Sequence, residues 1–177
     1  MLLIAVPATM ALIMLAEPVL ATLFQYGAFS ANDRMMAAAS LRAYALGLGA
    51  FMLVKVLAPG FYAREDMRTP VRIGIVAMVA NMVLNVALVF PLMWWFNLGH
   101  VGLALATAIA AWANAGMLYR GLRRDAILLL NALSIRWLMQ IAFGTLAMML
   151  VMWWMLPEQS LWTEWPWWQR ALQLGLL

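Results

Sequence analysis

The chain has 177 residues, of which 67% are hydrophobic and only 10% are charged. A typical soluble domain is about 45–50% apolar and about 25% charged, and no soluble fold of this size buries so much apolar side chain. The composition therefore excludes a soluble domain and predicts an integral membrane protein. The net charge of +4 does not indicate nucleic-acid binding, because basic residues of membrane proteins mostly mark cytoplasmic ends. With no cysteine and one histidine, we expect neither a disulfide framework nor a metal cluster.

Apolar runs predict an all-α, polytopic helical bundle of about six segments. The first five are expected at residues 2–24, 35–59, 71–95, 101–118 and 133–156. The sixth begins near residue 167 and is too short to span, because a spanning helix needs about 20 residues. The chain is therefore expected to be a piece of a longer protein.

Local signals refine three of these segments. Pro18 lies inside the first apolar run and predicts a bend, because proline removes a backbone hydrogen bond. Ser30 or Asn32 can cap the second helix. Gly47 and Gly49 give that helix a small-residue face, and the alanine-rich fourth segment also favours close helix contact.

The distribution of arginine predicts how the chain is oriented. Short loops rich in lysine and arginine stay in the cytoplasm. Two connections, residues 61–72 and residues 119–132, hold most of the arginines: Arg64, Arg68, Arg72, Arg120, Arg123 and Arg124. We expect these two loops to be cytoplasmic and the tryptophan-rich connection at residues 157–168 to face outward.

Two charged residues fall inside predicted spans, where charge is costly and suggests function. Glu17 has three explanations: it pairs with a cation, takes part in ion coupling, or sits at the bend with access to water. Lys55 either faces a polar cavity or snorkels to the interface. It lies about 13 Å along a helix from Arg64, a distance that its long stem shortens.

Several runs of the sequence carry a resemblance to a known family. The most specific is KVLAPGFYAREDMRTPV at residues 55–71, and the others are EPVLATLFQYGAF at 17–29, NVALVFPL at 85–92 and GLALATAIAAWANAGMLYRGLRR at 102–124. With these runs the chain resembles the MurJ/MviN family of bacterial lipid II flippases, of the MOP exporter superfamily. That family has two six-helix lobes around a central cavity and two extra C-terminal helices.

The resemblance implies that the six segments are helices nine to fourteen, the last one truncated. Residues 1–124 would then form part of the second transporter lobe, with four transmembrane helices. Residues 125–177 would form the C-terminal extra helices, one complete and one truncated. The N-terminal lobe, which holds most of the cavity arginines, would be missing from this chain.

The function implied by the resemblance is transport, not catalysis. A lipid II flippase of the bacterial inner membrane moves the pyrophosphate-linked peptidoglycan precursor from the cytoplasmic to the periplasmic leaflet, for cell wall biogenesis. The partners would be lipid II, membrane lipids and the missing lobe, and not nucleic acid. The alternatives are another MOP exporter, for drugs or polysaccharide intermediates, or a non-transporting membrane remnant or scaffold. A membrane-embedded transferase or hydrolase is disfavoured, because the acidic residues are scattered and histidine is nearly absent.

The resemblance also implies two sites. In the first, Lys55, Arg64 and Arg68 contact the substrate's diphosphate in the cavity, although topology alone or contact with anionic lipids also explains the arginines. No cofactor is expected, but some family members bind a sodium ion. Asn81, Asn85 and Thr107 fall at matching positions, and oxygen ligands suit a hard cation. Asn85 stands where those members have aspartate, and interhelical hydrogen bonding is the alternative for all three.

Overall fold

The computed structural model describes residues 2–24, 29–96, 98–124, 132–156 and 165–176, and its elements in these ranges are helices. They are α1 (Leu2–Phe24), α2 (Ala31–Tyr62), α3 (Arg68–Phe96), α4 (Gly99–Arg124), α5 (Ala132–Met155) and α7 (Trp167–Leu176). The first five are long and apolar enough to cross a membrane. The ten residues of α7 extend only about 15 Å, half of a bilayer core. The predicted all-α, polytopic fold is confirmed.

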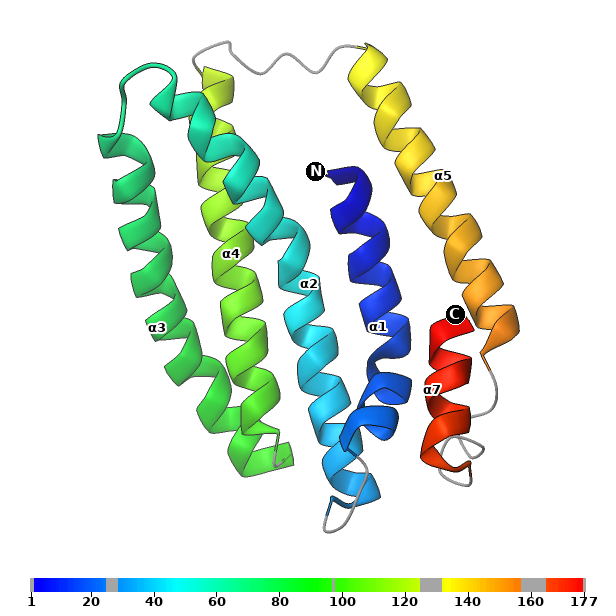
Figure 1. The fold of residues 1–177 in the computed structure, drawn as a ribbon. Coiled ribbons are helices and arrows are strands. Elements are labelled where there is room, and N and C mark those ends of the chain that lie inside the picture. Colours follow the sequence, from blue (N-terminus) through cyan, green and yellow to red (C-terminus); the bar gives the residue numbers. More distant parts are fainter. Residues whose placement is uncertain (1, 25–28, 97, 125–131, 157–164, 177) are drawn as a thin grey trace.

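The helices stand side by side in a row, as Figure 1 shows. α4 packs against both α2 and α3, whereas α2 and α3 barely touch each other. α1 packs against α2, and both α5 and α7 contact α1. As a result, the end of α2, the start of α3, the end of α4 and the start of α5 lie at one end of the row.

Small residues bring α2, α3 and α4 close together. A Cβ added to Gly47 of α2 would lie 3.0 Å from the Cα atom of Ala108 in α4, and one added to Gly102 of α4 would lie 3.0 Å from the carbonyl oxygen of Leu88 in α3. Membrane helices gain dispersion energy by such close approach, because lipid tails leave no hydrophobic driving force between helices. The predicted small-residue contacts of Gly47 and of the alanine-rich segment are confirmed.

The second helix begins at a capping box. The Ser30 hydroxyl accepts a hydrogen bond from the Asp33 N–H at 3.2 Å, and the Asp33 carboxylate accepts one from the Ser30 N–H at 2.9 Å. Of the two predicted caps, Ser30 is therefore the one used. The capping box starts α2 at Ala31, four residues earlier than the apolar pattern indicated.

The two predicted basic loops are mostly helical. α2 continues to Tyr62 and α3 begins at Arg68, so the predicted loop 61–72 shrinks to residues 63–67. α4 continues to Arg124 and absorbs the first part of the predicted loop 119–132, whose residues 125–131 lie outside the described residues. The predicted boundaries were wrong because arginine is a good helix former and its long stem reaches water from a helix end.

α1 bends in its second half, where Pro18 lies (Figure 1). Proline cannot donate to the carbonyl one turn earlier, which here belongs to Met14. The Thr22 hydroxyl donates to the Pro18 carbonyl at 2.7 Å, a bond that supports the turn after the bend. The bend predicted from the sequence is present.

Candidate functional site

One end of the row carries the arginines on which the orientation depends. The six side chains are all exposed and belong to the 63–67 connection, to the first turns of α3 or to the last two turns of α4: Arg64, Arg68, Arg72, Arg120, Arg123 and Arg124. The prediction that these arginines share one side of the membrane needs the end of α2, the start of α3 and the end of α4 to lie together, and they do. Such a cluster of arginines at one end is the pattern typical of the cytoplasmic side of membrane proteins.

The turn between α2 and α3 is a Schellman motif. The Asp66 N–H donates to the Phe61 carbonyl at 3.2 Å and the Glu65 N–H donates to the Tyr62 carbonyl at 3.0 Å. Glu65 has φ of 59°, the left-handed conformation that this motif requires and that glycine usually supplies. The motif reverses the chain within five residues, and it thereby holds Arg64 next to the start of α3.

The Asp66 carboxylate caps the start of α3. Its Oδ1 atom accepts hydrogen bonds from the Thr69 N–H at 3.0 Å and from the Arg68 N–H at 3.2 Å. The side chain of Thr69, followed by these backbone donors and the nearby Arg64 charge, lowers the pKa of Asp66 below its usual 3.8. The basic connection is thus fixed at both of its ends, by the Schellman motif at the end of α2 and by Asp66 at the start of α3.

Lys55 lies on the face of α2 that points away from α4. Ala50 and Leu57 are buried on the α4 side, whereas Lys55 is exposed together with Phe51 and Tyr62. Lys55 lies seven residues before the end of α2, about 10 Å from that end. This depth and exposure suit both a cavity-facing role and snorkelling.

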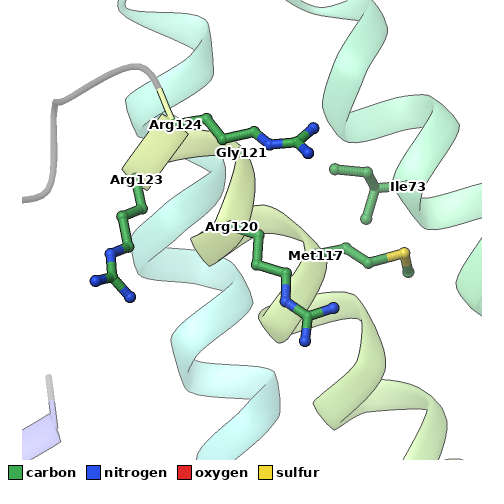
Figure 2. A pocket seen from close by; sticks show the side chains of 6 residues that line it. All are labelled: Ile73, Met117, Arg120, Gly121, Arg123 and Arg124. Carbon is green, nitrogen blue, oxygen red and sulfur yellow. The ribbon is translucent and has the colours of Figure 1, made fainter.

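A hollow of about 690 Å³ lies between α3 and α4 at the arginine end. Ile73 of α3 and Met117 and Gly121 of α4 line it together with three arginines: Arg120, Arg123 and Arg124. Figure 2 shows the guanidinium groups of Arg120 and Arg124 on the side of Ile73, while that of Arg123 points away from it. The sequence interpretation treated these arginines as topology signals and missed the hollow. The sequence shows that the arginines are about one turn apart, but it does not show that Ile73 of α3 lies beside them.

Asn81 and Asn85 lie one turn apart on the same face of α3. The side-chain oxygen of each is buried and accepts no hydrogen bond within the part of the chain that the structure describes. A buried oxygen without a donor costs free energy unless a water or an ion satisfies it. The predicted interhelical hydrogen bonding is therefore not found for these two oxygens.

Thr107 lies at the same depth as the two asparagines. The contact of Gly102 with Leu88 sets the register of the antiparallel α3–α4 pair. Five residues further along α4, Thr107 is level with position 83 of α3, between Asn81 and Asn85. The Thr107 hydroxyl donates to the Leu103 carbonyl at 2.9 Å, which leaves its oxygen lone pairs available to a water or a cation.

Glu17 forms an ion pair across the α1–α2 contact. Its Oε1 atom lies 2.9 Å from Nη2 of Arg42, and the side chain of Glu17 is only 15% exposed. The Arg42 Nε–H also donates to the Ile13 carbonyl at 3.2 Å, one turn before the bend. Pairing with a cation, one of the three predicted explanations for Glu17, is therefore observed.

Arg170 is a structural residue that the sequence did not reveal. Its side chain is buried, and its Nη1 donates to the Ala21 carbonyl at 3.0 Å, while its Nε donates to the Trp165 carbonyl at 2.8 Å. The Ala21 carbonyl lies in the last turn of α1, where backbone acceptors have no intrahelical donor. Arg170 therefore ties α7 to the end of α1.

Comparisons with known proteins agree with these features. A family model described as lipid II flippase MurJ matches residues 1–167. A probable lipid II flippase MurJ of Vibrio cholerae is 42% identical over 175 residues, which are 98% of this chain and 32% of that protein. A probable lipid II flippase MurJ of Haemophilus influenzae is 41% identical over 172 residues, 97% of this chain and 32% of that protein. A lipid II flippase MurJ of Burkholderia cenocepacia is 38% identical over 152 residues, 86% of this chain and 28% of that protein. The chain thus spans about a third of the length of the curated relatives it matches.

Proposed function

We propose that this chain, which belongs to the lipid II flippase MurJ family, is the part of a lipid II flippase that follows its first lobe. The protein would move lipid II from the cytoplasmic to the periplasmic leaflet of the bacterial inner membrane for cell wall biogenesis. The observation that carries the proposal is the family match over residues 1–167. The arginine-rich end, which charge asymmetry assigns to the cytoplasm, supports the orientation of the loops.

Transport by this protein would break no covalent bond. A flippase needs a polar path for a charged head group and a way to alternate its opening. Lys55, Arg64 and Arg68 supply cations at and below the cytoplasmic end, and we infer that they contact the substrate's diphosphate where it enters. The remaining lobe and the membrane lipids would complete the path, and nucleic acid would have no part in it.

A sodium ion is the proposed coupling ion. Three oxygen-bearing side chains support this: Asn81 and Asn85, with buried and unpartnered oxygens, and Thr107 at the same depth. Oxygen ligands are the chemistry that a hard cation prefers. Because the three ligands carry no charge, we expect the ion to bind more weakly than at a site with a carboxylate.

The transport proposal is tested with the complete gene that contains this reading frame. We expect that gene to rescue the growth of a strain depleted of its own lipid II flippase, and lipid II to reach the outer leaflet. Lys55→Ala should weaken the rescue, while Arg72→Ala, at the same membrane surface but outside the proposed site, should not. If the protein inserts at normal levels and lipid II stays inside, another exporter or a remnant scaffold is the correct reading.

The ion proposal has a separate measurement. The thermal unfolding temperature of the purified protein should be higher in sodium chloride than in potassium chloride at equal ionic strength. Asn81→Ala and Asn85→Ala should each remove that difference, because each deletes one oxygen ligand. Equal unfolding temperatures in the two salts would contradict a sodium site.

A further inference from the structure

The hollow between α3 and α4 presents two unpaired arginines on one helix face. Arg120 and Arg124 are one turn apart, where side chains on a helix are neighbours. Both are exposed, and neither forms an ion pair or a hydrogen bond within the described chain. Their guanidinium groups lie on the side of α4 that faces Ile73, with Met117 between them (Figure 2). The charge of the hollow is therefore not neutralised by the residues that the structure describes.

An apolar track leads from this hollow toward the middle of the membrane. Ile109, Ala113 and Gly116 lie at helical spacing on the same face of α4 as Arg120, and all three are exposed. A Cβ added to Gly116 would meet no atom within 4 Å. Ile109, Ala113 and Gly116 therefore form an open apolar stripe on α4 that continues from Arg120 toward the middle of the helix.

We propose that this hollow binds the phosphodiester head group of an anionic glycerophospholipid, with one acyl chain along the track of Ile109, Ala113 and Gly116. Guanidinium groups match phosphate oxygens in number and geometry and form charge-assisted hydrogen bonds with them. Basic pockets between transmembrane helices on the cytoplasmic side suit anionic head groups. The hollow, at about 690 Å³, lies within the range of small-molecule sites.

The track is the reason to choose a lipid over a soluble phosphate. A free phosphate would satisfy the arginines but make no contact with the exposed apolar track beside them. A lipid can contact the arginines and the track at once, because its phosphate is joined to an acyl chain and the arginines lie next to the track. The site does not involve Lys55, Arg64 or Arg68, so the proposal is independent of lipid II transport.

The experiment titrates phosphatidylglycerol onto the complete protein in neutral detergent and counts bound lipid by native mass spectrometry. Arg120→Gln and Arg124→Gln should each weaken binding about fivefold, from the roughly 1 kcal/mol that a basic residue contributes near an anionic lipid. Arg72→Gln is the matched control. It removes the same charge from the same end, but on α3 it lies two positions from the buried Pro70 and thus faces away from α4. We expect the control to change binding less than about twofold.

A second variant tests the track and identifies the ligand. Gly116→Leu places a bulky side chain on the track and leaves both arginines in place, so it should weaken phosphatidylglycerol binding while the protein elutes as a folded particle. Excess inorganic phosphate should fail to displace the lipid. Equal loss in Arg72→Gln and Arg120→Gln would show a diffuse surface attraction, and displacement by phosphate would show a phosphate site. Either result, or no loss in any variant, would overturn the proposal.

Discussion

The two sides of α2 are held to their neighbours by different forces. Toward α4, the middle of the contact is made of small residues such as Ala50, which is fully buried, and Gly47, whose backbone nearly touches Ala108. The cytoplasmic part of this contact is a cluster of Leu57, Phe61, Leu118 and Leu122. Toward α1, the contact is polar, with Arg42 bound to Glu17 and to the Ile13 carbonyl. The polar contact lies beside the bend of α1. Arg42 binds the Ile13 carbonyl, which is next to the Met14 carbonyl that Pro18 leaves without its helical donor.

α3 and α4 differ in the fraction of each helix that is buried. α3 is the more apolar of the two, yet only 6% of its most apolar stretch is buried, against 44% for α4. In a soluble protein the more apolar helix would be the interior one. Here most buried residues of α4 are alanine or glycine, because close approach is what stabilises helix pairs in lipid, and most large apolar residues of α3 are exposed.

The largest expected change in stability compares two glycines, one on α4 that is packed against α3 and one on α3 that has no close neighbour. Gly102→Val forces a branched side chain against the Leu88 backbone, which is 3.0 Å from an added Cβ, and should lower the free energy of unfolding by about 1–3 kcal/mol. Gly74→Val on α3, where nothing lies within 4 Å, should leave it nearly unchanged. Unfolding in detergent measures both. Equal losses would show that α3 is as closely covered as α4.

The next effect addresses the polar side of α2. Glu17→Gln leaves the Arg42 charge without its partner and should lower the free energy of unfolding by about 1–2 kcal/mol, less than for a fully buried pair because Arg42 is 40% exposed. Arg42→Gln and the double variant complete a cycle that isolates the coupling of the pair. Additive losses in that cycle would mean that the two residues act independently.

A smaller effect, of opposite sign, is expected at the cytoplasmic turn. Glu65→Gly should raise the free energy of unfolding by up to about 1 kcal/mol, because glycine adopts the left-handed conformation of the Schellman motif without steric cost. Glu65→Ala removes the same carboxylate but keeps the strain, so it serves as the control. The unfolding temperature of Glu65→Gly should be higher than that of Glu65→Ala. Identical unfolding temperatures would mean that the loss of the carboxylate charge, and not the backbone conformation, causes any change in stability.

The smallest effect concerns the half-buried Asp66 and appears only in acid. Folding lowers the pKa of Asp66 below 3.8, so its contribution to stability is complete above that value and is lost as the pH falls through the lowered pKa. The difference in unfolding temperature between the native protein and Asp66→Ala should be constant near neutral pH and should shrink below about pH 4. A difference that persists in strong acid would contradict a role for the carboxylate charge.

Much of the site followed from residue types, and its remainder depended on neighbours far away in the sequence. The arginines at positions 64, 68 and 72 predicted their shared side of the membrane, and Ser30 and Pro18 predicted a cap and a bend, because these signals act within one or two turns. The partner of Glu17, the hollow beside Arg120 and the role of Arg170 were not predictable. Each depends on which helix stands beside which, and the spacing of residues along one helix does not encode that.

The sequence by itself determined that this chain has helices able to cross a membrane, which helix ends gather the arginines and to which family it belongs. Apolar length, charge asymmetry and a long specific motif are local properties, and the bilayer converts them directly into topology. Only the tertiary structure decided that α4 lies between α2 and α3, that the amide oxygens of Asn81 and Asn85 are buried without donors, and that Arg120 and Arg124 border a hollow. These outcomes depend on how whole helices pack. A glycine contributes to that packing by allowing the backbone of a neighbouring helix to come close.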